Sequence, residues 1–449
     1  MQVKVSLILP SLNVAPYIGE CLESAAAQSL RELEILCVDA GSTDGTEQII
    51  RDFAGQDKRI RLIHSPIKSY GCQVNIGLDQ AAGEYVAILE TDDFVHADMY
   101  GFLYEEAASG DLDQAAADYD TFRCLQSGVY HFERKRFFGG ERTNWYGKIL
   151  CPAQIATLRA CDHVLWKGIY KKAFLDTHHI RLHETSGAAF QDMGFLQQIK
   201  TYVSTAKYLD KSFYRYRLDR KEASSADLRG LFCYEEEFRW LERILPQPLP
   251  GIHQAYYSVT MAVAFLTKYE QILTALKGDW EDERLSGPCS WFGARLLEFL
   301  QDGHITRELL GNVYWDRLHM LLFKERSAHA SLVMSAQQEK ERPLKELKRL
   351  CKDRPVVIFG CGRRGERLML VCEEGNISIQ AFLDNSPALQ GRTWYGFDVY
   401  APAYSGATKG ESLILLSMKK GCDQARSQLL EAGVSRERII STLPEELFG

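Results

Sequence analysis

The chain has 449 residues, of which 46% are hydrophobic and 25% charged, and its formal net charge is -7. This composition is typical of a folded globular protein and excludes disorder over most of the length, and at this size it predicts two or three domains. No long basic run occurs, which argues against a nucleic-acid partner.

The first ninety residues predict strands that alternate with helices. Four apolar segments rich in β-branched side chains are Val3–Leu9, Leu33–Val38, Ile60–Ile63 and Tyr85–Leu89. Between these strands lie segments whose apolar residues recur at helical spacing. Asp44 with Glu47 predicts a capping box for the helix that ends near Phe53. The pattern indicates an α/β domain with a parallel sheet covered on both faces, which binds ligands at the carboxyl ends of its strands.

Three carboxylates, Glu90, Asp92 and Asp93, directly follow the fourth predicted strand. Carboxylates repel one another, so this cluster is unfavourable without a cation. Mg²⁺ binds carboxylate oxygens together with substrate phosphates, and it would offset the charge that grows on a diphosphate leaving group. An acidic turn that caps the next helix is the alternative, and spacing alone does not separate the two.

Asp192 stands in a largely apolar segment, Phe190-Gln191-Asp192-Met193-Gly194-Phe195. Desolvation by such neighbours would raise the pKa of Asp192 and make its carboxylate a better general base. A helix N-cap is the alternative, because apolar residues follow Asp192 at helical spacing.

Residues 228–352 are expected to be mainly helical and to end in a highly charged segment, Gln337–Lys352, that forms an exposed helix or linker. These helices are expected to shape an acceptor site or to form the contact of a homodimer.

A new strand–turn–helix unit begins at Pro355. The strand Val356–Phe359 leads into Gly360, Gly362 and Gly365, and a second strand, Ile379–Leu383, ends at Asp384. In this context the glycine pattern is typical of nucleotide-binding sites, with a phosphate at the helix N-terminus. A glycine-rich turn without a ligand is the alternative, and one or two further strands are expected.

Four motifs in the first domain follow one another in order. They are Val5-Ser6-Leu7-Ile8-Leu9-Pro10-Ser11-Leu12-Asn13-Val14, Asp39-Ala40-Gly41-Ser42-Thr43-Asp44-Gly45-Thr46, Asn75-Ile76-Gly77 through Ala82-Gly83-Glu84-Tyr85, and Glu90-Thr91-Asp92-Asp93. Together they resemble the family 2 glycosyltransferases of the GT-A fold, and the resemblance extends from about Val3 to Asp227.

The resemblance implies a donor site for a nucleotide sugar. Its nucleotide would be bound by Pro10, Ser11, Asn13, Asp39, Ser42, Asn75, Glu90 and Thr91. Asp39 would contact the base, and Asp92 would hold Mg²⁺ or Mn²⁺ with help from Glu90. On the acceptor side the resemblance implies that Asp192 is the general base, with Gln191 and Trp166 lining the acceptor pocket, although an isolated Trp is more often a core residue.

The sequence departs from the family pattern at four positions, one of which is Leu12, where a Tyr is frequent. Glu90 replaces the usual first Asp, Ala40 replaces a second Asp in the base-binding turn, and Val74 stands where an Arg often precedes the Asn. The resemblance therefore predicts an inverting transferase, with a UDP-sugar favoured as donor, that acts on a glycan or lipid-linked glycan in bacterial cell-surface polysaccharide synthesis. The alternative is a catalytically weakened nucleotide-sugar-binding or scaffold protein.

The predicted organisation is a GT-A domain over residues 1–227, a helical region over 228–352 and a small Rossmann-like domain over 353–449. The last resembles modules found on sugar acyltransferases, and an NAD-dependent redox domain is a further hypothesis. A cytoplasmic location is expected, because the start of the chain lacks a secretory pattern and the cysteines lack metal-type spacing. A lipid-linked acceptor would bring the protein to the inner face of the membrane.

Overall fold

The computed structural model describes residues 2–158, 164–220, 227–404, 406 and 410–448. The chain forms two compact units, one of residues 1–122 with 133–333 and the other of residues 123–132 with 334–449. The helices that follow residue 228 therefore belong to the same unit as the N-terminal sheet, up to residue 333.

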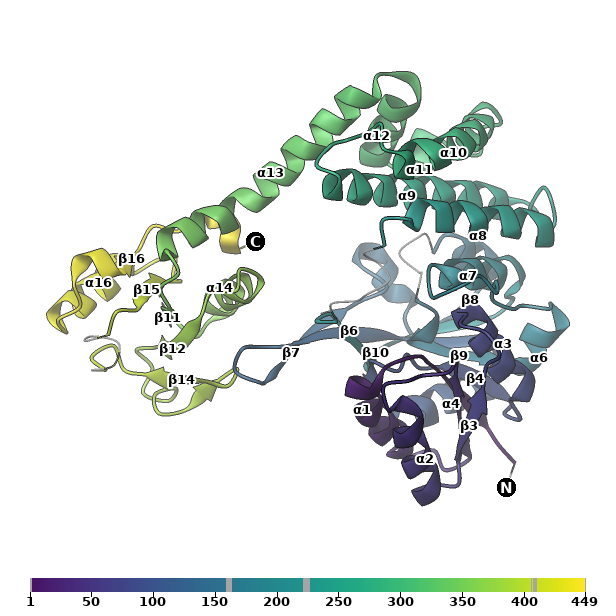
Figure 1. The fold of residues 1–449 in the computed structure, drawn as a ribbon, viewed down its shortest axis with the longest axis horizontal. Coiled ribbons are helices and arrows are strands. Elements are labelled where there is room, and N and C mark those ends of the chain that lie inside the picture. Colours follow the sequence, from purple (N-terminus) through teal and green to yellow (C-terminus); the bar gives the residue numbers. More distant parts are fainter. Residues whose placement is uncertain (1, 159–163, 221–226, 405, 407–409, 449) are drawn as a thin grey trace. The chain divides into compact units, whose positions relative to one another are not determined.

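The first unit is built on a ten-stranded sheet (Figure 1). Its strands are β1 (Val5–Ser11), β2 (Leu33–Asp39), β3 (Ile60–His64), β4 (Tyr85–Ile88), β5 (Phe94–Val95), β6 (Gln114–Cys124), β7 (Tyr130–Lys135), β8 (Ile149–Leu150), β9 (Gly168–Lys171) and β10 (Ala206–Arg217). The helices connecting them are α1 (Ala15–Ala26), α2 (Thr46–Gln56), α3 (Tyr70–Gln80), α4 (Met99–Ser109), α5 (Pro152–Ala156), α6 (Lys172–Thr177) and α7 (Gln191–Tyr202), with short 3₁₀ turns η1 (Gly140–Trp145) and η2 (Leu165–Lys167).

The strand order is β3-β2-β1-β4-β9-β6-β10-β5, with β7 beside β6 and β8 beside β10. The predicted α/β class is confirmed, and β3, β2, β1 and β4 are parallel as expected. The rest of the sheet is mixed, because β9 runs antiparallel to both β4 and β6. Every residue of β1 and β2 is buried, which explains why these strands appear in the sequence as nearly continuous apolar runs.

The start of α2 corrects one local prediction. Gly45 is the N-cap of α2, and Asp44 accepts hydrogen bonds from Thr46 N (3.1 Å) and from Ala15 N at the start of α1 (2.9 Å). Glu47 instead pairs with Arg51 one turn along the helix. The predicted capping box is therefore wrong, because Asp44 joins the starts of two helices.

The mainly helical middle region is confirmed. Its helices are α8 (Gly230–Ile244), α9 (Ile252–Ala275), α10 (Glu283–Gln301), α11 (Arg307–Leu310), α12 (Asn312–Phe323) and α13 (Arg326–Cys351), the last of which carries the charged segment. Their shared core is aromatic, with Phe238, Phe265 and Phe292 buried, and it includes Met193 of α7. The helices therefore pack on the element that bears Asp192. Among the described residues, no helix has the length and apolar character to cross a bilayer.

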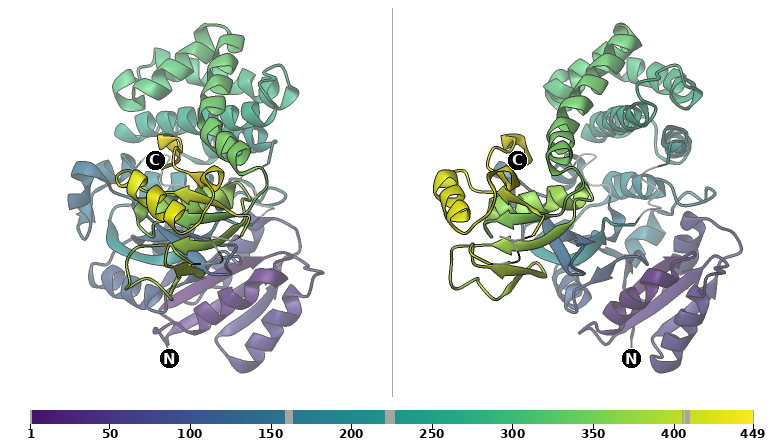
Figure 2. Two further views of the ribbon diagram at one scale, coloured as in Figure 1. Left: turned by 90° about the vertical axis from the view of Figure 1, so that its left-hand side faces the viewer. Right: turned by 60° about the vertical axis from the view of Figure 1, so that its left-hand side comes forward.

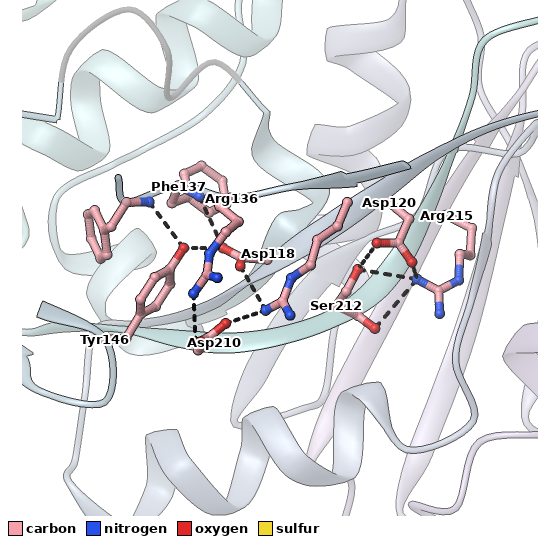
Figure 3. A network of polar contacts seen from close by, with 10 residues as sticks. Asp118, Asp120, Arg136, Phe137, Tyr146, Asp210, Ser212 and Arg215 are labelled. Carbon is pink, nitrogen blue, oxygen red and sulfur yellow. Dashed lines mark hydrogen bonds and ion pairs between the residues drawn. The ribbon is translucent and has the colours of Figure 1, made fainter. Parts of the chain in front are cut away.

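A polar network ties the segment after β7 to the sheet (Figure 3). The side chain of Asp118 on β6 is fully buried and accepts hydrogen bonds from Tyr146 Oη (2.6 Å), Phe137 N (3.0 Å) and Arg134 Nη2 (3.0 Å). Arg134 also pairs with Asp210, which is about half exposed. The buried carboxylate thus organises a loop that has little regular structure of its own.

The second unit contains a small, mainly parallel sheet of the predicted Rossmann-like kind. Its elements are β11 (Val356–Phe359), α14 (Arg363–Glu374), β12 (Ile379–Leu383), β13 (Thr393–Trp394), β14 (Phe397–Tyr400), β15 (Leu413–Leu416), α16 (Cys422–Glu431), η4 (Arg436–Arg438), β16 (Ile439–Ile440) and η5 (Glu445–Phe448). The order is β13-β14-β12-β11-β15-β16, and only β13 is antiparallel to its neighbour. This sheet has more strands than the sequence predicted. The strands β13 and β16 are only two residues long, which is too short to give a recognisable pattern in the sequence.

Helices α14 and α16 cover opposite faces of this sheet (Figure 2). Alternate residues of β11 serve the two cores, with Ile358 in the core beneath α14 and Phe359 in the core beneath α16. The tip of the β6–β7 hairpin completes the first core through Leu125, and Gln126 Nε2 donates to the Ile377 carbonyl (3.0 Å). Nothing in the sequence indicated that this hairpin belongs to the C-terminal unit.

Candidate functional site

The acidic triplet lies at the carboxyl edge of the first sheet, directly beyond β4. Leu89 N donates to the Ile8 carbonyl (2.9 Å), and Thr91 Oγ1 donates to the Pro10 carbonyl (3.1 Å). Strand β1 lies between β2 and β4, so the triplet and the turn after Asp39 flank the same strand end. This is the edge at which sheets of this type bind ligands.

The end of β10 encloses two of the three carboxylates. Asp93 is buried and accepts hydrogen bonds from Tyr214 Oη (2.8 Å) and Arg217 N (2.8 Å). Burial raises the pKa of Asp93 well above its usual range, and the charge of Asp92 raises it further. Asp92 is more open, and its Oδ2 pairs with Arg220 Nη1 at 2.8 Å. The basic segment at the end of β10 thus balances the acidic triplet.

Glu90 has a partner from another element. Tyr70 is the first residue of α3, and its Oη donates a hydrogen bond to Glu90 Oε1 at 2.5 Å. Burial raises the pKa of Glu90 to about 8; the Tyr70 hydrogen bond opposes this shift, whereas the charges of Asp92 and Asp192 add to it.

The donor atoms at this edge fit a hard divalent cation. Mg²⁺ or Mn²⁺ needs oxygen ligands, and a protein commonly supplies one or two carboxylates while substrate phosphates and water complete the shell. Asp92 and Glu90 offer such oxygens at the end of β4. Within the described residues, no three His, Cys, Asp or Glu side chains form a ready-made metal cage.

Asp192 lies in the first turn of α7. The N-cap of this helix is Phe190, whose φ of 67° is unusual for a residue with a side chain, so the alternative of Asp192 as N-cap is wrong. Met193 N donates to Asp192 Oδ1 at 2.8 Å. The positive end of the helix dipole favours the ionised carboxylate at this position.

The predicted base-binding turn is a closed network. Asp39 is fully buried and accepts hydrogen bonds from Gly41 N (2.8 Å), Ser42 N (2.8 Å), Ser42 Oγ (2.6 Å) and Ser11 Oγ (3.2 Å). Asn13 joins it, since its backbone N–H donates to Ser42 Oγ at 2.9 Å. Asp39 therefore organises the turn in this structure, and its contact with a nucleotide base stays a prediction.

Asn75 and Gln191 both hold the segment that leads to Asp192. Asn75 Nδ2 donates to the Leu182 carbonyl and to Glu184 Oε1, each at 2.9 Å. Gln191 is buried, and its Nε2 donates to Thr185 Oγ1 at 2.6 Å. Their predicted contacts with donor and acceptor stay predictions, because these side chains already have protein partners.

Trp166 is 5% exposed and packs face to face on Tyr214, with ring centroids 3.9 Å apart, and on Tyr216, at 5.3 Å. Of the two alternatives for this residue, the packing favours a core role. Tyr214 is also the residue that hydrogen-bonds Asp93, so this stack supports the floor of the acidic site.

The comparisons with known proteins identify the family. The sequence model described as glycosyl transferase family 2 matches residues 6–162. Residues 6–162 therefore form a family 2 glycosyltransferase domain. GlyG, a glycosyltransferase of Streptococcus pneumoniae, is 27% identical over 221 residues, which are 47% of this chain and 70% of GlyG. YibD, described as an uncharacterized glycosyltransferase of Escherichia coli, is 28% identical over 230 residues, 51% of this chain and 65% of YibD. The predicted family and its transferase class are confirmed.

The predicted GT-A fold is confirmed by a solved structure. The crystal structure of S. aureus TarS 1–349 in complex with UDP-GlcNAc has a TM-score of 0.56 at 19% identity, and the match covers 75% of this chain and 92% of that chain. At this identity the likeness shows the fold alone. The matched share exceeds residues 1–227, so the likeness takes in more of the chain than the predicted GT-A domain.

The sequence did not single out two residues that lie near the site of this family 2 domain. Tyr70 belongs to no chemical motif, and Glu237 stands in a run of three glutamates that resembles a solvated helix face. In the structure Glu237 is 1% exposed, and its Oε2 lies 3.0 Å from His183 Nδ1. Only the packing of α8 on α7 turns this carboxylate inward.

The glycine-rich turn of the C-terminal unit has the expected backbone. Gly360 has a φ of 112°, and a Cβ on Gly365 would lie 1.9 Å from the Gly360 carbonyl oxygen, whereas Gly362 faces open space. Asp384 accepts from Cys361 N (2.9 Å), so its carboxylate lies where a phosphate would seek that N–H. Nucleotide binding by Gly360, Gly362, Gly365 and Asp384 stays a prediction.

Proposed function

We propose that this family 2 domain transfers a sugar from a nucleoside diphosphate sugar, with a UDP-sugar favoured, to a hydroxyl group of a glycan or lipid-linked glycan, with inversion at the anomeric carbon. The choice of UDP is supported by the TarS structure, which is a complex with UDP-GlcNAc. Cell-surface polysaccharide synthesis, on the cytoplasmic side and in some cases at the membrane face, is the setting that suits such an acceptor.

In the proposed reaction Asp192 accepts the proton of the attacking hydroxyl. Its place in the first turn of α7 puts the carboxylate at the positive end of the helix dipole. Asp92 and Glu90 would hold Mg²⁺ or Mn²⁺, which when bound supplies positive charge to the leaving diphosphate. Arg220, already paired with Asp92 at 2.8 Å, is placed to share that charge with phosphate oxygens.

One observation supports this proposal above the others. Asp192 comes from α7 and the acidic triplet from the end of β4, yet Tyr70 links the two segments. Its Oη donates to Glu90 Oε1 at 2.5 Å, and its backbone N–H donates at 2.9 Å to the Gly187 carbonyl, which also accepts from Gln191 Nε2 beside Asp192 at 3.4 Å. A base tied to the acidic site in this way suits an in-line displacement at the anomeric carbon.

The experiment separates donor binding from transfer. A thermal-shift screen of nucleotide sugars with Mn²⁺ identifies the donor, and Asp92→Asn should lose the Mn²⁺-dependent part of the shift because it removes a ligand charge. Asp192→Asn should keep donor binding but lose transfer about 100-fold or more, the usual effect of removing a general base. Asp98→Asn is the matched control, since Asp98 follows the same strand region with an exposed side chain.

Retention of transfer by Asp192→Asn would contradict the assigned base, and a metal-independent donor shift would contradict the role of Asp92. The alternative of a scaffold protein has a specific observation in its favour. Ala40 and Val74, which replace polar residues of the family pattern, are buried, and their side chains carry no hydrogen-bonding group. Donor binding by the wild type with neither transfer nor donor hydrolysis would support that alternative.

A further inference from the structure

Tyr70 touches both halves of the candidate site. Through its side chain, Oη donates to Glu90 Oε1 at 2.5 Å. Through its backbone, the N–H of Tyr70 donates to the Gly187 carbonyl at 2.9 Å, and Gly187 N returns a bond of 2.9 Å to the Lys68 carbonyl. Ser69 and Gly187 thus form a short parallel bridge between the start of α3 and the segment before α7.

Gln191, the residue before Asp192, holds the same segment before α7. Gln191 Nε2 donates to Thr185 Oγ1 at 2.6 Å, and Gln191 Oε1 accepts from Ala189 N at 2.8 Å. The loop before α7 packs closely against the start of α3. A Cβ on Gly71 would lie only 2.1 Å from the His183 carbonyl oxygen. A connected path therefore leads from Glu90 through Tyr70 and the loop to the first turn of α7.

Electrostatics agree with this geometry. Burial raises the pKa of Tyr70, and the charges of Glu90 and Asp192 raise it further, so the tyrosine stays neutral and its hydroxyl remains a donor. A neutral hydroxyl that donates to Glu90 holds that carboxyl group without itself binding a cation.

We infer that Tyr70 is a positioning residue that holds Glu90 toward the donor diphosphate and keeps it in register with the loop that carries Asp192. The inference rests on the proposed function, because it assumes that Glu90 serves the donor site. It requires that the Tyr70 hydroxyl act through Glu90 and not through general stability of the domain.

The test measures binding of UDP in the presence of Mn²⁺ by calorimetry, with transfer as a second readout. Tyr70→Phe should weaken UDP binding about tenfold, since the buried hydrogen bond that orients Glu90 is lost. In a Glu90→Gln background the same substitution should change UDP affinity less than twofold, because the group through which it acts is already altered. Equal losses in the two backgrounds, or no loss in the wild-type background, would overturn the inference.

Two further variants keep the test decisive. Tyr104→Phe is the control, because it removes another tyrosine–glutamate bond of the same unit, Tyr104 Oη to Glu84 Oε2 at 2.9 Å, and should leave UDP affinity unchanged. Glu90→Asp keeps the carboxyl group on a side chain that is one methylene shorter, so its loss of UDP affinity should match that of Tyr70→Phe. This variant serves as the test if Tyr70→Phe folds poorly. Unchanged UDP affinity in Glu90→Asp would also overturn the inference. Failure of the wild type to bind UDP would instead contradict the proposed donor.

Discussion

The buried carboxylate of Glu237 should make the stability of the first unit depend on pH. Burial raises the pKa of Glu237 from the ordinary 4.5 to about 7; the hydrogen bond from His183 opposes this shift, and the charges of Asp192 and Glu236 add to it. Glu237 Oε1 also has no hydrogen-bond partner among the described residues. The folded state therefore holds the proton of Glu237 more tightly than the unfolded state does.

The direction in which stability changes with pH follows from this difference in pKa. A group whose pKa is higher in the folded state contributes stability that is present below pH 4.5 and is lost as the pH rises through about 7. A shift of this size corresponds to a loss of about 3 kcal/mol in the free energy of unfolding by pH 8. Glu237→Gln resembles the protonated form at every pH, so it should be close to wild type at pH 4.5 and more stable by up to about 3 kcal/mol at pH 8.

The assay is urea unfolding followed by circular dichroism at half-unit steps from pH 4.5 to 8. Glu236→Gln is the matched control, because Glu236 precedes Glu237 on α8 but is exposed, and its curve should stay within about 0.5 kcal/mol of wild type. A Glu237→Gln curve that runs parallel to wild type across this range would refute the reasoning, since it would mean that Glu237 titrates alike in both states.

Three further pairs of variants test other features of the structure. Gly365→Ala should lower the melting temperature of the second unit in calorimetry, whereas Gly362→Ala should leave it unchanged, because only the first places a Cβ against backbone, at 1.9 Å; equal effects would contradict the packing of the turn. Asp118→Ala should cost about 3–5 kcal/mol in urea unfolding because it leaves a buried network unpaired, against less than about 1 kcal/mol for the half-exposed Asp210→Ala, and similar values for the two would contradict the burial. Trp166→Phe should preserve transfer while Trp166→Ala loses about 3–5 kcal/mol of stability; loss of transfer in a stable Trp166→Phe variant would instead favour stacking on a sugar.

Local pattern predicted the framework of the site well. The strands β1 to β4 lie within about two residues of their predicted ends, because continuous apolar runs bounded by turn residues depend only on neighbours along the chain. The acidic triplet follows β4, as the sequence indicated, whereas Asp192 lies in the first turn of α7 and not at its N-cap. The topology then brings these strand and helix ends to one edge, which the alternation of elements also predicts.

What each side chain does there could not be predicted in the same way. Asp39 and Asn75 were expected to meet the donor, yet each is occupied by protein partners, and the partners of Asn75 lie more than 100 residues away. The 3₁₀ turn before β9 gave no sign that Trp166 would lie against Tyr214 instead of facing a pocket. Such contacts depend on how separate elements pack, and local periodicity does not report that packing.

The sequence by itself determined the resemblance of the N-terminal domain to family 2, the order of strands and helices in the first ninety residues, and the residue types at the acidic edge. These are properties of short stretches of chain. Only the tertiary structure decided that Tyr70 joins Glu90, that Arg220 pairs with Asp92, that Glu237 turns inward and that the tip of a hairpin completes the core of the C-terminal unit. The physical reason is distance along the chain: each of these contacts joins segments that 20 or more residues separate, and each forms only once the elements between them have packed.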